Sequence, residues 1–165
     1  MQNKTRSTKK QQMQRIIQWY RDETGSDSVD MREVAKFAVG KGFQLPKPKD
    51  PITHLAEKFA DAAREETRKD EKTGRTYRAN LAVVNHTASG QYTLWGDIDT
   101  APRKFAQKAF VQRREHMVGE AVQLTLDVDH WNIVNPLEEP ILMPIDFTDD
   151  VEERLNAPDE INIAA

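Results

Sequence analysis

The spacing of apolar residues changes twice along the chain, and each change predicts a different kind of element. In residues 9–69 apolar side chains recur every three or four positions, as on one face of an α-helix. In residues 75–98 they alternate with polar residues, as in half-buried strands. Helical spacing returns in residues 102–131. The pattern predicts three short helices, a β-hairpin and one long helix, in that order.

Capping residues predict where the first two helices begin and end. Thr8 followed by Gln11 is a capping-box pattern, and Gly25 ends the periodic stretch that begins there. Asp30 and Glu33 repeat the arrangement for a second, shorter helix. The two helices are therefore bounded by local chemistry alone.

A third helix is expected after a proline-stiffened connector. Asp50 followed by Pro51 is a natural N-cap and first helical residue, and the periodic stretch runs to about Lys69. A turn at residues 70–74 leads into the first strand, and turn residues at 85–91 join it to the second.

The long helix after Pro102 has more apolar surface than one neighbour needs to cover. At 1.5 Å per residue it would be about 45 Å long. Its near-heptad seam favours pairing with the same helix of a second copy, and folding back across its own domain is the alternative. The expected dimerisation residues are Phe110, Met117, Ala121, Leu124, Val128 and Trp131.

The last thirty residues differ in composition from the rest. Four prolines and many carboxylates in 136–165 predict an acidic tail that is extended or disordered. It could solubilise the protein, cover a basic face, or dock on a protein partner through Leu142, Ile145 and Phe147. The spacing of these three resembles that of sliding-clamp-binding peptides, without their leading glutamine.

Charge is segregated along the chain. Residues 1–114 contain 23 Lys and Arg against 14 Asp and Glu, whereas residues 115–165 contain one basic residue and 13 acidic ones. Such asymmetry favours contact of the basic part with nucleic acid. The absence of cysteines excludes disulfides and thiolate metal sites, and no apolar run is long enough to span a membrane. With no secretory signal pattern at the N-terminus, we expect a cytoplasmic protein.

No arrangement typical of an enzyme is found. The four histidines lack metal-ligand spacing, and the seven glycines form no phosphate loop. Asp97 and Asp99 could hold Mg²⁺ as in a nuclease, but acidic residues there are better explained as the start of the next helix. We therefore expect no enzymatic activity, no cofactor and no bound metal.

The order of elements in residues 9–98 resembles a winged helix-turn-helix domain. The fold class predicted is mainly α with a small β-hairpin. A basic arm (1–8) precedes the winged-helix-like domain (9–98), which is followed by the long helix (99–135) and the acidic tail (136–165). In such domains the third helix enters the major groove of DNA and the hairpin loop contacts the backbone.

The resemblance implies a protein that binds double-stranded DNA. Together with the charge segregation, the apolar seam of the long helix and the lack of catalytic motifs, it predicts a non-enzymatic, dimeric transcriptional regulator or accessory factor. The alternative is a protein–protein adaptor or antitoxin-like protein of a phage or mobile element, which uses its tail to bind a partner. The DNA-binding residues implied are Lys9, Lys10, Lys47, Lys49, Thr53, His54, Lys58, Arg64, Arg75 and Arg78.

Overall fold

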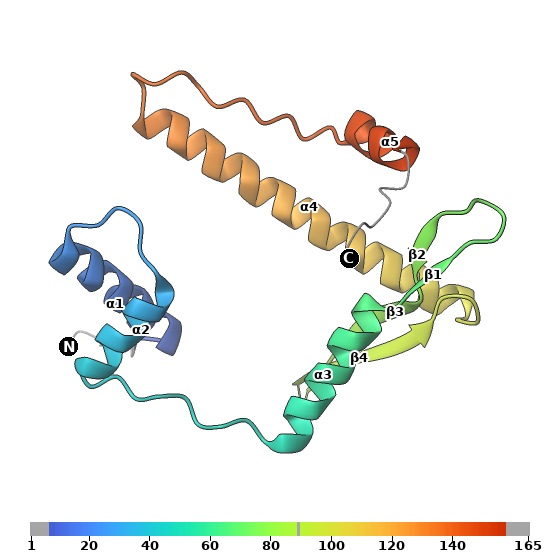
Figure 1. Cartoon of the computed structure of the whole chain (residues 1–165), viewed down its shortest axis with the longest axis horizontal. Helices are drawn as coiled ribbons and strands as arrows, with labels where there is room; N and C mark the ends of the chain where they lie inside the picture. The colour runs from blue at the N-terminus through green and yellow to red at the C-terminus, as the bar shows by residue number, and fades with distance from the viewer. Residues whose placement is uncertain (1–6, 89, 158–165) are drawn as a thin grey trace, which may run out of the picture. The chain divides into compact units, whose positions relative to one another are not determined.

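A computed structural model describes residues 7–88 and 90–157 (Figure 1). The chain divides into two compact units, residues 1–56 and residues 57–165. Residues 1–6 of the expected basic arm and residues 158–165 of the expected tail lie outside the described ranges.

The coarse fold class is confirmed, because the described chain is mainly helical with two small antiparallel sheets. None of its helices has the length and apolarity needed to cross a membrane. The helices are α1 (Lys9–Thr24), α2 (Met31–Gly40), α3 (Pro51–Glu65), α4 (Arg103–Val134) and α5 (Thr148–Asn156), and the strands are β1 (Thr67–Lys69), β2 (Thr76–Arg78), β3 (Asn80–Thr87) and β4 (Gly90–Asp97).

The first unit contains α1 and α2, whose ends are set by the predicted caps. The hydroxyl of Thr8 accepts the N–H of Gln11, and the Gln11 side chain accepts the N–H of Thr8, which completes the capping box. Gly25 ends α1 in the left-handed conformation that favours glycine, with φ of 65°. The carboxylate of Asp30 caps α2 by accepting the N–H of Arg32.

An aromatic cluster joins the two helices of the first unit. The ring of Phe37 meets both Trp19 and Tyr20 edge to face, with centroids 5.3 Å apart in each pair. The ammonium of Lys41 lies 4.6 Å from the centre of the Trp19 ring, so the charge is held over an aromatic face.

Helix α3 starts as predicted but ends four residues early. Asp50 accepts both the N–H and the hydroxyl of Thr53, as an N-cap does. The helix ends at Glu65 because the N–H of Ala79 bonds to the carbonyl of Glu66 and the next residues form β1. The predicted end at Lys69 is wrong, since pairing with β2 takes residues 67–69 out of the helix.

The chain after α3 forms two hairpins where one was predicted. The continuous strand expected from residue 75 is divided at Ala79, which is fully buried. β2 pairs antiparallel with β1 across a turn in which Asp70 accepts the N–H groups of Lys72 and Thr73. β3 pairs with β4, and in this pairing Leu81 lies opposite Gly96.

The core of the second unit lies between the β3–β4 hairpin and the first half of α4. Leu81 and Val83 of β3 pack against Ala109 of α4, with Ile98 and Phe105 partly buried beside them. This packing places α4 beside β3, and it positions the site described below.

The tail contains a helix that the sequence pattern did not predict as a formed element. The amide of Asn132 near the end of α4 bonds to both the N–H and the carbonyl of Ile141. After the extended stretch that follows, the chain forms α5, whose Leu155 carbonyl accepts a hydrogen bond from Arg75. Residues 139–147 form no helix or strand, whereas Thr148–Asn156 is helical and departs from the expected extended or disordered tail.

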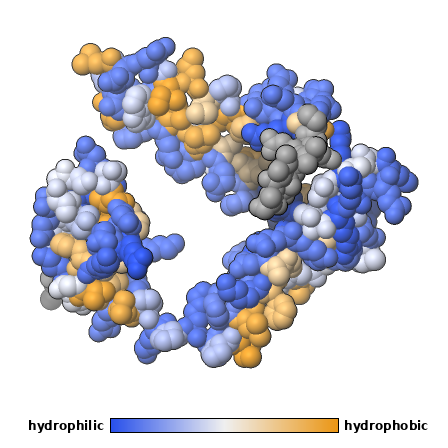
Figure 2. All heavy atoms as spheres, in the orientation of Figure 1, coloured by the Kyte–Doolittle hydropathy of each residue, from blue (hydrophilic) through white to orange (hydrophobic). Residues whose placement is uncertain are grey.

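Little of the apolar surface is buried. The chain exposes 15184 Å², whereas compact proteins of its mass expose about 8,300 Å², or about 10,000 Å² as two separate bodies of these sizes. Apolar side chains are visible at the surface along α4 and α3 (Figure 2). Met117 of α4 is 60% exposed and Phe59 of α3 is 69% exposed.

Candidate functional site

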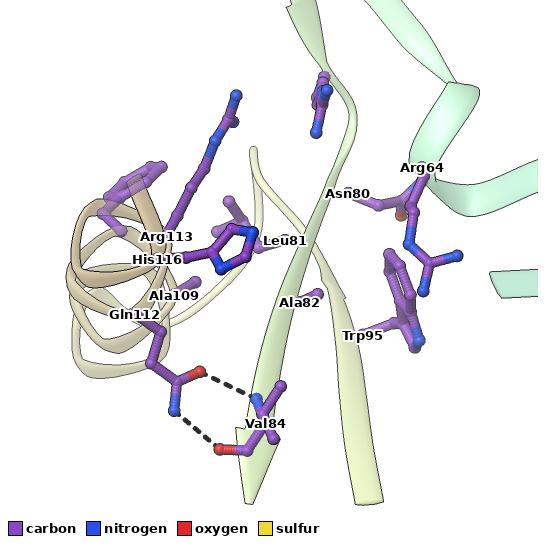
Figure 3. A pocket seen from close by; sticks show the side chains of 12 residues that line it. Arg64, Asn80, Leu81, Ala82, Val84, Trp95, Ala109, Gln112, Arg113 and His116 are labelled. Atoms are coloured by element: carbon purple, nitrogen blue, oxygen red, sulfur yellow. Dashed lines mark hydrogen bonds between the residues drawn. The ribbon is translucent and has the colours of Figure 1, made fainter. Parts of the chain in front are cut away.

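A groove of about 370 Å³ follows the outer edge of β3 in the second unit (Figure 3). Its floor is formed by the β3 backbone and by small or apolar side chains of β3, β4 and α4. Four basic or potentially basic side chains and no carboxylate line it. The lining residues are Arg64, Arg78, Asn80, Leu81, Ala82, Val84, Trp95, Ala109, Phe110, Gln112, Arg113 and His116.

The edge of β3 that faces this groove is not paired with another strand among the described residues. The N–H of Val84 donates to the side-chain oxygen of Gln112 at 2.9 Å, and the Gln112 amide donates back to the Val84 carbonyl at 2.8 Å (Figure 3). Val84 therefore directs its backbone groups away from β4. Because antiparallel pairs alternate, Ala82 and His86 also direct theirs outward.

One wall of the groove is formed by Trp95 and Arg64. Alternation along β4 places Trp95 on the sheet face opposite α4. The guanidinium of Arg64 lies 5.4 Å from the centre of the Trp95 ring and also pairs with Asp61 at 2.6 Å. Arg64 is thus held in place at the groove.

In the described part of the chain, the other basic side chains of the groove have no carboxylate partner. Among the described residues, Arg78, Arg113 and His116 form no ion pair with a carboxylate. Uncompensated positive charge around one hollow attracts anionic groups.

The basic and acidic residues of helix α4 are segregated along its length. Its N-terminal part, residues 103–114, contains five basic residues and no acidic one, and residues 115–134 contain four acidic residues and no Lys or Arg. A helix dipole favours the opposite arrangement by about 0.3–1 kcal/mol per charge near an end. Pro102, at the N-cap, supplies no side-chain hydrogen bond to the first turn. The helix dipole therefore does not explain why Arg103 and Lys104 lie in the first turn.

Asp97 and Asp99 serve an ion-pair cluster. Arg68 of β1 donates to Asp97 and to Asp99, each at 2.6 Å, and the hydroxyl of Tyr77 donates to Asp99 at 3.2 Å. The hydrogen bond from Arg68 lowers the pKa of Asp97, and the same hydrogen bonds raise the pKa of Arg68. Partial burial and the bond to Asp99 raise the pKa of Tyr77.

This cluster bears on the nuclease alternative. Both carboxylates are engaged by a guanidinium, and the described residues contain no group of three His, Asp or Glu placed to hold a metal ion. The ion pairs of Arg68 with Asp97 and Asp99 join the β1–β2 hairpin to the end of β4.

The residues expected to contact DNA fall into two separate sets. In the first unit, Lys9 and Lys10 lie in the first turn of α1, and Lys9 lines a surface hollow together with Lys47. In the second unit, Arg64 and Arg78 share the groove.

The other residues that were expected to contact DNA are dispersed along the chain. The Thr53 hydroxyl is engaged with Asp50, and His54 follows it in the first turn of α3. Lys58 is exposed on α3, and Lys49 lies in the connector before that helix. Arg75 precedes β2, whereas the sequence pattern placed it in the strand that leads to the β3–β4 loop. Arg78 likewise ends β2.

Most residues expected at protein interfaces lie at the surface. On α4, only Ala121 and Val128 are half-buried, and the other four of the predicted seam are exposed. In the tail, Leu142 is 84% exposed, and Ile145 and Phe147 are also exposed.

Of the twelve residues that line the groove, only Arg64 and Arg78 were predicted to contact DNA and only Phe110 was predicted at the dimer seam. Arg113 counted in the sequence only toward the basic excess of residues 1–114, and Gln112 carried no signal. The spacing of Arg113 and His116, three apart on one helix face, was the one available sign of a polar stripe. The partnership of Gln112 with Val84 spans 28 residues and has no local signature.

No family model matches the chain, and neither the curated proteins nor the solved structures contain a significant match to it.

Proposed function

We propose that this protein is a dimeric, cytoplasmic DNA-binding protein that acts as a regulator or accessory factor and catalyses no reaction. One observation carries the proposal: the N-terminal part of α4, residues 103–114, contains five basic residues and no acidic one, and Arg103 and Lys104 lie in the first turn, where the helix dipole disfavours positive charge. An external polyanion gives these charges a role that helix stability does not.

Other basic residues extend this part of α4 into a wider surface. Within the second unit, Arg113 of this part lines the groove together with Arg64 and Arg78. Lys108 bonds to Asn85 near the end of β3, so the start of α4 and the hairpin form one basic region. In a winged-helix arrangement, α3 would read bases and the β3–β4 loop would contact the backbone. The basic residues would supply affinity by releasing counterions.

A salt titration tests this function. A labelled duplex is titrated with the full chain at low and raised salt, and fluorescence anisotropy reports binding. We expect affinity to fall steeply with salt. Replacing Arg103, Lys104 and Lys108 by Gln should weaken binding and reduce the salt slope by about 0.9 for each phosphate that the variant no longer neutralises.

The control is Lys36→Gln in the first unit, where the lysine is already paired with Glu33. It should leave both affinity and slope nearly unchanged. A second variant, with Glu138 and Glu139 replaced by Gln, tests whether the acidic tail inhibits DNA binding. Tighter binding of the duplex by this variant than by the natural chain would reveal such inhibition. Failure of both this variant and the natural chain to bind at low salt would refute the proposal.

The exposed tail favours a second candidate, a protein–protein adaptor. Leu142, Ile145 and Phe147 are all exposed on a segment whose backbone is hydrogen-bonded to Asn132 of α4 at Ile141. If this is the function, replacing the three by Ala abolishes capture of a partner and leaves DNA binding unchanged. If the DNA function is correct, the same variant keeps its salt-dependent affinity for the duplex.

A further inference from the structure

The free edge of β3 presents chemistry that the proposed DNA function does not use. Val84 already shows what this edge accepts, because the Gln112 amide pairs with it as the peptide group of a neighbouring strand would. Gln112 thus caps one position of an edge that would otherwise be open to strand addition.

The positions on either side of this cap remain open. Ala82 lies in the groove itself, and by alternation its N–H and carbonyl face outward with no partner among the described residues. His86 has the same orientation at the far side of Val84. The edge therefore offers donors and acceptors in the order that an extended peptide complements.

The surroundings of this edge set the chemistry of its occupant. In the described part of the chain, Arg78, Arg113 and His116 are unpaired, and no carboxylate lines the groove. Trp95 and Phe110 add apolar walls. A segment with alternating acidic and apolar side chains complements both features.

We propose that the free edge of β3 is a docking site for an extended acidic peptide segment, which adds as a third strand to the β3–β4 sheet. The unpaired backbone favours a peptide over nucleic acid. A phosphodiester supplies acceptors only and would leave the carbonyl of Ala82 without a donor, whereas a peptide supplies both. The peptide would pair with the backbone edge, which the DNA function does not use, but it would share Arg78 and Arg113 with the proposed DNA surface.

A peptide titration tests the proposal on the full chain. The probe is a labelled, end-blocked peptide of about seven residues in which glutamate and valine alternate, enough to pass the four outward-facing residues of β3 and to replace Gln112 at Val84. Fluorescence polarisation should show saturable binding. The same peptide methylated on the backbone nitrogens that face β3 should bind at least about tenfold more weakly.

Two neighbouring arginines supply matched variants. Arg113→Glu, in the groove, should weaken peptide binding about tenfold or more, whereas Arg114→Glu, on the same helix but outside the groove lining, should change it little. Circular dichroism confirms that both variants remain folded. Equal effects of the two variants, or equal binding of the methylated and unmodified peptides, would overturn the proposal.

Two further outcomes identify the occupant. If Arg113→Glu but not Arg114→Glu weakens binding of a labelled duplex while peptide binding is unchanged, the groove is a nucleic-acid site and the proposal is wrong. If Arg113→Glu alone reduces self-association of the chain, the occupant is the acidic extended segment of a second copy, residues 137–147, and the proposal is supported.

Discussion

Gly96 is the residue whose size decides how closely α4 approaches the β3–β4 hairpin. A Cβ atom at this position would lie 2.9 Å from Cε1 of Phe105, and the ring is partly buried against the core. Because that ring packs beside Leu81 and Ala109, it cannot move away freely.

We therefore expect Gly96→Ala to destabilise the second unit by about 1–3 kcal/mol, as overpacking does. Urea unfolding followed by circular dichroism measures the change. Gly119→Ala is the matched control, since nothing lies within 4 Å of its added methyl group and alanine favours helix by about 1 kcal/mol. A combined Gly96→Ala and Phe105→Leu chain should recover part of the loss, and equal stability of the two alanine variants would contradict this account.

Arg68 gives the second unit a pH-dependent stabilisation. Its hydrogen bond keeps the pKa of Asp97 below the ordinary value, so the folded state binds fewer protons than the unfolded state at acidic pH. The contribution is complete above about pH 4, the unfolded pKa, and is lost as the pH falls through the folded pKa.

We expect the difference in unfolding free energy between the natural chain and Asp97→Asn to shrink steadily as the pH falls below about 4. Asp70 and Asp146 also have lowered pKa values, so both chains lose stability in acid, and only the difference reports Asp97. Urea unfolding at a series of pH values gives that difference. A difference that is constant across the series would show that Arg68 does not hold Asp97 ionised.

At the scale of elements, two amide side chains of α4 each hold another segment of the second unit by paired hydrogen bonds. Gln112 pairs with both backbone groups of Val84, and Asn132 pairs with both backbone groups of Ile141. One amide thus holds a strand edge and the other holds the returning chain. The extended tail segment needs this anchor because its own side chains are exposed.

Asn132→Ala should release the tail without unfolding the hairpin. Losing a hydrogen bond worth about 1 kcal/mol should speed amide exchange at Ile141 by about fivefold or more. Hydrogen exchange at Val84, which Gln112 holds, serves as the internal reference and should not change. Unaltered exchange at Ile141 would mean that the tail is held by other interactions.

For the whole molecule, the proposed dimer would give the exposed apolar side chains of α4 a partner. Phe110, Met117 and Trp131 of the predicted seam are exposed in the single chain. A two-fold pairing of α4 helices buries such a surface with the same residues from each copy.

We expect sedimentation to show a dimer, and Met117→Glu combined with Leu124→Glu to shift it to monomer, because two charges would then face an apolar seam. Gln123→Glu, which adds a charge beside the seam, should leave the dimer intact. Identical sedimentation of the natural chain and the Met117→Glu, Leu124→Glu variant would exclude this seam as the interface.

The sequence by itself determined the starts of the first three helices and the end of α1, because a capping side chain reaches only three or four residues along the chain. Thr8 with Gln11, Gly25, Asp30 and Asp50 all act within that range. It also determined the existence of α4. The predicted turn at residues 85–91 is wrong in extent, because residues 85–87 pair with residues 90–92 as the end of β3 and the start of β4.

Tertiary structure decided what depended on partners far along the chain. The early end of α3 and the division of the strand at Ala79 follow from hydrogen bonds made by residues 66–69 with β2 and Ala79. The groove depends on Gln112 meeting Val84, and the engagement of Asp97 depends on Arg68, 29 residues away. Periodicity records which face of an element is apolar, but not which backbone edge or side chain another element will meet, and for that reason these features emerged only in the folded chain.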